Sequence, residues 1–194
     1  MTTRPNMIKG ILGSALLITT SVSEAREIEW VIQAELSTGG DKIAEVIFDD
    51  GSKETIYGGG AYMFGGGILV DTLSDSSIYQ TQLTINYKFD SSNASNGDIS
   101  WDRYPLELIQ FFNTDQWRLG AGLSYHLSPS VSGSGFASGF DANFDDALGF
   151  VAEIDYLFDD QGFIGGRISS IEYKSEYGGT MDGSSIGLIV GAHF

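Results

Sequence analysis

The sequence of 194 residues contains no cysteine and only three prolines. Without cysteine, a disulfide scaffold and a thiolate zinc site are both excluded. Basic residues are also scarce, because ten Lys and Arg stand against 26 Asp and Glu and leave a formal net charge of −16. A protein this acidic does not hold nucleic acid through its phosphates, so nucleic acid is excluded as a partner.

Long apolar runs are missing as well. No stretch of about 18 or more uninterrupted apolar residues occurs, which argues against a helical membrane span. The hydrophobic content of 42% is nevertheless too high for a disordered chain. A chain of 194 residues is long enough for one domain with a sizeable core.

The N-terminus has the three-part pattern of an export signal. Two basic residues precede an apolar run over 11–22, and Ser23 and Ala25 follow as small residues at the positions that a signal peptidase reads. This run is too short to span a bilayer. We therefore predict a cleaved signal peptide over 1–25 and one mature domain over 26–194; a buried N-terminal helix is the alternative.

Alternation of apolar and polar residues organises the rest of the chain. A period of two, typical of a strand with one apolar face, holds in three segments: Ile78–Phe89, Trp117–Leu127 and Ser185–Phe194. Five further segments follow it less perfectly: 29–38, 61–71, 100–112, 147–158 and 163–174. Each is longer than the usual strand of about 5 to 6 residues and matches the ~9 to 11 that cross a membrane at a tilt.

Short and long connections alternate between these predicted strands. The short ones cover 72–77, 113–116 and 159–162, and the long ones cover 39–60, 90–99, 127–146 and 175–184. This is the layout of an outer-membrane barrel with both termini in the periplasm and its free loops outside. We therefore predict an all-β fold, an eight-stranded antiparallel up-and-down transmembrane β-barrel.

Two segments depart from the simple pattern. Residues Lys42–Ile56 alternate around an Asp-Asp-Gly turn, which indicates a hairpin within the first long loop. An extra strand pair, giving a ten-stranded barrel, is the alternative. Pro105 lies inside a predicted strand, and because proline cannot donate to a ladder, we expect a bulge there.

The polar face of the strands carries four acids and four bases, although acids far outnumber bases in the whole chain. A closed interior must balance its charges, because an unpaired buried charge costs several kcal/mol. We therefore expect the polar face to line the lumen and the apolar face to meet lipid. The predicted lumen network consists of Glu35, Gln80, Gln82, Lys88, Arg103, Glu107, Arg118, Glu153, Asp155 and Arg167, with Gln33 beside them.

Pairing neighbouring strands in sequence order predicts contacts within this network. We expect Arg118 and Arg167 to flank Asp155, and we expect Lys88 and Arg103 to lie near Glu107. Aromatic residues should form two girdles at the membrane interfaces. One girdle is predicted from Trp30, Trp117, Tyr156, Phe158 and Phe194, and the other from Tyr62, Tyr87, Phe89, Trp101, Tyr104 and Tyr125.

The last residue, Phe194, follows apolar residues at Ile186, Leu188 and Val190. In this C-terminal segment, in strand number and in loop alternation, the sequence resembles the small eight-stranded outer-membrane β-barrels of Gram-negative bacteria, such as the OmpA membrane domain, OmpX and the OmpW group. The resemblance implies that Phe194 is the signal read by the barrel-insertion machinery. It also implies a monomer in the cell outer membrane, with lipid and lipopolysaccharide as partners.

The interior of an eight-stranded barrel is just wide enough to be filled by side chains. We therefore expect a plugged polar lumen and a non-enzymatic role in membrane integrity or surface interaction. The alternative is a narrow channel for ions or small solutes, since inward glycines such as Gly120 and Gly191 leave room for water or for long arginines.

A lipid A-modifying hydrolase is the third hypothesis. Ser124 and His126 share one face of a strand, and Glu153 lies on the next strand. Parity places His126 inward, away from lipid, so we predict no catalytic residue. The acidic loop over 141–146 lacks the glycine and distal Glu of an EF-hand, and we predict no metal site and no cofactor.

Overall fold

The computed structural model describes residues 28–48, 51–73, 76–94, 97–158 and 161–194. The predicted signal peptide lies outside these residues. Within the described ranges there is no helix with the length and apolar character of a membrane span.

Eight strands form one closed barrel, and each pairs antiparallel with its neighbours. They follow the order β6-β5-β4-β1-β13-β10-β9-β7, and pairing of β6 with β7 closes the sheet. The predicted eight-stranded antiparallel β-barrel is confirmed. The strands are β1 (Ile28–Thr38), β4 (Ala61–Leu73), β5 (Ser76–Ala94), β6 (Gly97–Asn113), β7 (Trp117–Gly133), β9 (Ala147–Phe158), β10 (Gly162–Ser170) and β13 (Ser185–His193).

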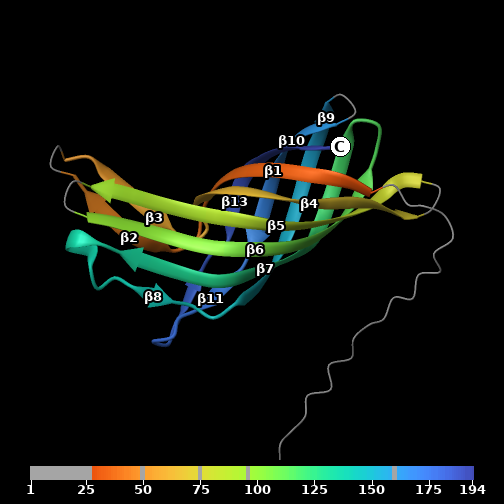
Figure 1. Ribbon diagram of the computed structural model, residues 1–194. Helices are drawn as coiled ribbons and strands as arrows, with labels where there is room; N and C mark the ends of the chain where they lie inside the picture. Colours follow the sequence, from red (N-terminus) through yellow and green to blue (C-terminus); the bar gives the residue numbers. More distant parts are fainter. Residues whose placement is uncertain (1–27, 49–50, 74–75, 95–96, 159–160) are drawn as a thin grey trace, which may run out of the picture.

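The remaining elements gather at one end of the barrel, which we call the loop end; the opposite end is the turn end (Figure 1). β2 (Lys42–Ile47) and β3 (Lys53–Tyr57) form a separate two-stranded sheet. The predicted hairpin within the first loop is therefore correct, and the ten-stranded alternative is wrong. The other loop-end elements are η1 (Gly135–Ala137), β8 (Ala142–Asn143), β11 (Glu172–Lys174) and β12 (Thr180–Asp182).

Three barrel strands run past their predicted limits at the loop end. The segment 90–99, predicted as a free loop, mostly continues β5 and β6, with Asn93 opposite Asp98, while β7 extends to Gly133. The prediction of a free loop is wrong because Ile99 and Val131 are buried in a shared apolar cluster that holds the extended strands together. The polar composition of residues 90–99 had indicated a loop rather than a continuation of the two strands.

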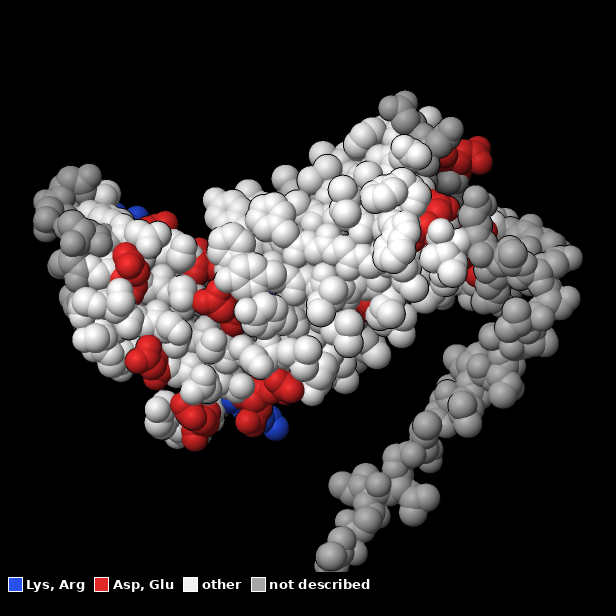
Figure 2. Space-filling view, viewed as in Figure 1, with Lys and Arg blue, Asp and Glu red and all other residues white. Residues whose placement is uncertain are grey.

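The outside of the barrel is apolar. Leu83, Ile85 and Leu119 are between 42% and 62% exposed, whereas their sequence neighbours Gln82 and Arg118 are each 1% exposed. Figure 2 shows a largely uncharged middle zone, with acidic side chains towards the ends. An apolar belt of this size is stable only against lipid, so the barrel spans a membrane with its polar parity inside.

Substituting Ile85 with Arg tests this assignment. Ile85 lies near mid-height, because its ladder partner Gly66 also faces Ile32 in the middle of β1. A guanidinium at this depth loses its hydration, so the free energy of unfolding in lipid vesicles should fall by about 2 to 4 kcal/mol in urea titrations. Tyr177→Arg, at an exposed loop-end position, is the control. Equal losses in both variants would contradict the lipid-facing assignment.

Aromatic side chains form belts near both ends, with one departure from prediction. At the turn end Trp117 packs edge-on against Tyr156, with ring centroids 5.2 Å apart. At the loop end Tyr87 stacks on Tyr104 at 5.3 Å. Trp101, predicted in the same belt, is fully buried inside the barrel. Odd-numbered residues of β6 point inward. Trp101 therefore has the same parity as the buried lumen residues Arg103 and Glu107, and this parity could have identified it as buried.

Pro105 interrupts the ladder differently from the prediction. The described pairing of β5 with β6 skips Tyr104 and Pro105, and the Asn86 side-chain amide donates to the Pro105 carbonyl at 3.3 Å. The register shift lies on the other side of β6, between Asp102 and Tyr104 opposite β7. A side chain thus replaces part of the backbone pairing at the proline, and the irregularity sits just before it.

Candidate functional site

The lumen is the candidate site, because every residue of the predicted network is buried there. The six strands β1, β5, β6, β7, β9 and β10 supply these side chains from their inward parity. The buried set is Glu35, Gln80, Gln82, Lys88, Arg103, Glu107, Arg118, Glu153, Asp155 and Arg167.

Arg167 is the centre of the middle layer of the lumen. Its guanidinium lies 2.5 Å from Glu107, 3.4 Å from Glu35 and 3.6 Å from Glu153. Glu35 also accepts a hydrogen bond from Lys88 Nζ at 2.9 Å. The three carboxylates come from β1, β6 and β9, so one arginine of β10 joins distant strands of the barrel wall, and Lys88 of β5 is linked to it through Glu35.

Two of the expected ion pairs are replaced by others. Arg118 Nε lies 2.6 Å from Asp155, as expected from their positions opposite each other on β7 and β9. Arg167, also expected at Asp155, contacts Glu153 instead, because Glu153 is its direct ladder partner. Lys88 contacts a β1 carboxylate rather than Glu107, since a long side chain reaches across so narrow a lumen.

Arg103 lies above this network, away from Glu107. Its Nη2 donates to the Gly60 carbonyl at 3.0 Å, and its Cζ lies 4.7 Å from the centre of the Trp101 ring. Among the described residues, no carboxylate lies within 4.0 Å of its guanidinium. The expected pairing of Arg103 with Glu107 is therefore wrong: Glu107 is occupied by the arginine of the middle layer.

Buried amides connect the middle layer to the turn-end half. Gln82 donates to Gln33 at 3.0 Å, Gln33 donates to Asn86 at 3.0 Å, and Asn86 donates to Glu107 at 3.2 Å. Asn86 was not predicted, although it shares the inward parity of Gln82. Gln80 lies apart from this chain, closer to the turn end. It donates to Asp71 and accepts a hydrogen bond from Asn113.

Two aromatic rings enclose Arg118 in the turn-end half. Its Cζ lies 4.2 Å from the ring centre of Phe111 and 3.9 Å from that of Phe163, close enough for cation–π attraction. Gly120 faces Phe111, and Gly191 faces Phe163. A Cβ at Gly120 or Gly191 would lie 2.5 Å or 2.3 Å from those rings. The inward glycines therefore make room for aromatic rings.

Inward apolar residues of the turn-end half were not predicted. They share the parity of the polar lumen residues, so parity rather than polarity identifies them; Phe111, for example, lies four positions after Glu107 on the buried face of β6. The two clusters are Val31, Leu69, Phe163 and Ile189, and Ile109, Phe111 and Val151.

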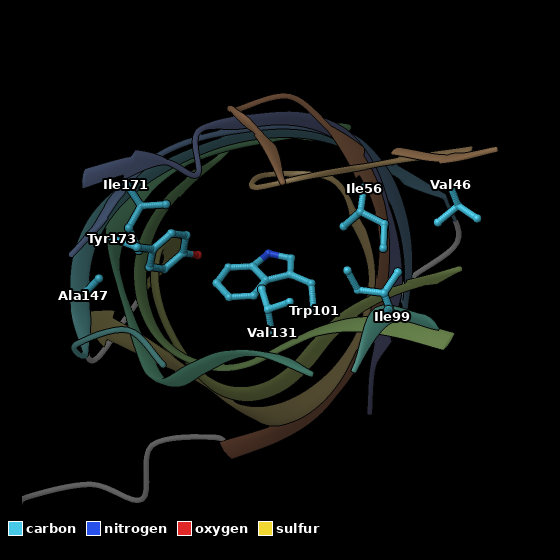
Figure 3. Packing of buried hydrophobic residues seen from close by; sticks show 9 residues of the cluster. Val46, Ile56, Ile99, Trp101, Val131, Ala147, Ile171 and Tyr173 are labelled. Carbon is cyan, nitrogen blue, oxygen red and sulfur yellow. The ribbon is translucent and has the colours of Figure 1, made fainter. Parts of the chain in front are cut away.

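A larger apolar cluster, the cap cluster, lies at the loop end. Trp101 lies near the centre of the barrel and Tyr173 points towards it from the wall, with ring centroids 5.3 Å apart and planes at 85° (Figure 3). The Trp101 indole donates to the Gly58 carbonyl at 3.0 Å, which fixes the ring beneath the first loop. The cap cluster consists of Val46, Ile56, Ile99, Trp101, Val131, Ala137, Ala147, Ile171 and Tyr173.

Hydrogen bonds join the first long loop to the fourth at the loop end. The Asp41 N–H donates to the Asp182 carbonyl at 2.8 Å, and the Asp182 N–H donates to the Asp41 carboxylate at 2.9 Å. Gly59 packs so closely that a Cβ would lie 2.2 Å from the Ser184 carbonyl oxygen. Only glycine permits this approach, so the two loops pack closely against each other where they leave β1 and β13.

Ser124 and His126 meet, but not as a nucleophile and its base. The Ser124 hydroxyl donates to Glu107 at 2.9 Å, so the contact of His126 Nε2 with Ser124 Oγ at 3.0 Å requires the histidine to donate. The Tyr173 hydroxyl lies 2.7 Å from His126 Nδ1 and completes the chain. Glu153, the acid expected from the sequence, is not part of it. The side chains of Ser124 and His126 are both buried inside the barrel, away from lipid.

Within the described residues, no three His, Asp or Glu side chains come together in a way that could hold a metal ion. The lumen carboxylates instead face arginine and lysine side chains.

Comparison with known proteins identifies the fold. No family model matches the sequence, and no curated protein matches it. The attachment invasion locus protein Ail of Yersinia pestis is 13% identical, with a TM-score of 0.54 over 86% of this chain and 97% of that one. Neisserial surface protein A is 12% identical, with a TM-score of 0.50 over 88% of this chain and 100% of that one.

These likenesses establish the fold. The chain has the architecture of the small eight-stranded outer-membrane β-barrels, the class that its sequence resembles. Closed β-barrels of this kind, with an apolar exterior and a polar interior, are the β-structures that cross outer membranes. The fold and the apolar belt together place the protein in an outer membrane.

Proposed function

We propose that the protein is an outer-membrane barrel with a plugged, non-conducting lumen, and that it acts without enzymatic chemistry through its loop end. Its role is in membrane integrity or surface interaction. The observation that carries the proposal is the succession of buried side chains along the lumen. Arg118 and its two aromatic partners occupy the turn-end half, the Arg167 network the middle, and the cap cluster the loop end.

Charge balance in the lumen also favours a plug over a channel. Many ion-selective conduits carry rings of charged side chains of one sign along their path. Among the described residues the buried acids and bases of the lumen are equal in number, and most are joined in ion pairs that an ion would have to separate. They are Glu35, Glu107, Glu153 and Asp155 against Lys88, Arg103, Arg118 and Arg167.

We expect no steady current when the purified protein is reconstituted in a planar bilayer. Because apolar clusters and ion pairs follow one another along the lumen, the conductance should stay at the level of the protein-free bilayer. A general porin in the same bilayer provides the positive control, and heat-modifiable migration on a gel shows that the barrel is folded. Reproducible single-channel steps would instead support the narrow-channel alternative.

The loop end is the surface available for interaction. Ail has been solved in complex with sucrose octasulfate, a heparin analogue and a polyanion. Here the loop end is rich in acidic side chains, and Figure 2 shows few basic ones on the face it draws. With a net charge of −16, the protein favours cationic partners over polyanions.

A further inference from the structure

We propose that the free edge of β2 binds an extended, cationic peptide segment of another protein by strand addition. The edge and the groove beside it lie at the loop end, outside the apolar belt. This inference deepens the surface-interaction part of the proposed function and rests on the loop end being exposed outside the membrane.

The groove runs along β2. Its volume is about 330 Å³, and it is lined by five consecutive residues, 42–46, together with Ile99, Ala137 and Phe140. Consecutive residues of a strand point to opposite faces. A groove that touches all five therefore follows the edge of the strand rather than one of its faces.

The edge of β2 that faces the groove has no strand beside it. In the described part of the chain, β2 pairs with β3 and with no other strand. An unpaired strand edge presents a row of backbone donors and acceptors, which is a template for another strand. The six residues of β2 offer an edge of about 20 Å at the usual rise per residue.

The residues that line the groove favour a bound peptide with apolar side chains at alternate positions. Ile99 and Ala137 are buried members of the cap cluster and form its fixed side. Phe140 also lines the groove and is 63% exposed. An added strand would turn every second side chain towards these residues and the others towards water, so the peptide should alternate apolar and polar residues.

Charge selects the kind of partner. On the edge itself Glu45 is compensated, because Lys42 and Lys53 contact it at 2.7 Å and 3.3 Å; the acidic charge comes from the surroundings of the groove. Asp98 and Asp141 adjoin groove residues in the chain and lie exposed. A second copy with a net charge of −16 would be repelled, whereas a peptide with basic flanks would be attracted.

Fluorescence polarisation with a synthetic peptide tests the proposal on the protein in lipid nanodiscs. The probe is a labelled peptide of alternating Val and Thr with two Lys at each end. A matched peptide with prolines at the Thr positions lacks half of the backbone donors of the probe and pairs poorly as a strand, and one with Glu flanks has the wrong charge. We expect both to bind at least about tenfold more weakly than the probe.

Variants of the protein locate the site. Ala44→Trp fills the groove and should abolish binding, whereas Thr180→Trp, on β12, should leave it unchanged. Heat-modifiable migration checks that both variants are folded. The proposal is overturned if the probe binds no better than the proline peptide, or if Ala44→Trp binds it normally. Self-association of the protein that Ala44→Trp removes would also overturn it, because the occupant would be a second copy.

The closed-lumen proposal stands or falls on a different measurement. Peptide binding is read in nanodiscs and does not depend on whether ions pass through the barrel. A steady bilayer current with normal peptide binding would contradict the plugged lumen alone. Absence of peptide binding in a barrel that carries no current would contradict strand addition alone.

Discussion

Replacing Arg167 with Met is expected to lower the free energy of unfolding by about 3 to 5 kcal/mol. The substitution removes the cation that contacts Glu35, Glu107 and Glu153, all buried, and leaves their carboxylates with too little positive charge. The loss arises from stranded charge rather than from lost volume, since Met fills much of the same space. Urea titration in lipid vesicles, followed by tryptophan fluorescence, measures it.

Two further variants, a control and a rescue, also remove a charged side chain. Lys53→Met removes an exposed cation and should change the free energy of unfolding by less than about 1 kcal/mol. Adding Glu107→Gln to Arg167→Met removes one stranded carboxylate, so the double variant should recover part of the stability. An Arg167→Met variant as stable as Lys53→Met would mean that water, and not Arg167, compensates the lumen carboxylates.

Replacing Trp101 with Ala is expected to cost about 3 to 5 kcal/mol as well, through a cavity. The indole is fully buried, packs against Tyr173 and donates to the Gly58 carbonyl. Its loss removes the centre of the cap cluster and the hydrogen bond that fixes the first loop. Equilibrium unfolding in urea gives the cost, and limited proteolysis should show faster cleavage within the first loop.

An exposed aromatic of the same loop region provides the comparison. Phe140 is 63% exposed, so Phe140→Ala should change the free energy of unfolding by no more than about 0.5 kcal/mol and leave the proteolysis pattern unchanged. If the Trp101 and Phe140 variants behave alike, the buried position of Trp101 in the cap cluster is contradicted.

The period of two was sufficient to predict the barrel and the orientation of most of its side chains. Arg118 and Leu119 are neighbours in the sequence, yet one is buried and the other is 47% exposed. Because a strand directs consecutive side chains to opposite faces, one correctly phased strand decides the side of every residue in it. The sequence therefore indicated which face of each well-patterned strand is buried.

Contacts between those side chains could not be predicted in the same way. Arg167 reaches Glu35 on β1 and Glu107 on β6, neither of which is a neighbour of β10 in the sheet. Such contacts depend on barrel diameter, strand tilt and side-chain length together, and none of these follows from sequence spacing. Only pairs directly opposite on adjacent strands, such as Arg118 and Asp155, were within reach of the prediction.

The prediction failed at the loop end for a different reason. Residues 90–99 are polar enough to suggest a free loop, but Ile99 and Trp101 continue the inward parity of β6 and bury their side chains in the cap cluster. Composition and parity disagreed at this point, and parity was right. Above a membrane, a ladder with polar outward residues is stable if its inward residues have something to pack against.

The clasp between Asp41 and Asp182 joins residues 141 positions apart, directly above the seam where β1 meets β13. Pairing of β1 with β13, the first and last strands of the described residues, closes the cylinder, so we expect this contact to form when the barrel closes. A binder raised against it would therefore distinguish finished molecules from those whose seam is still open.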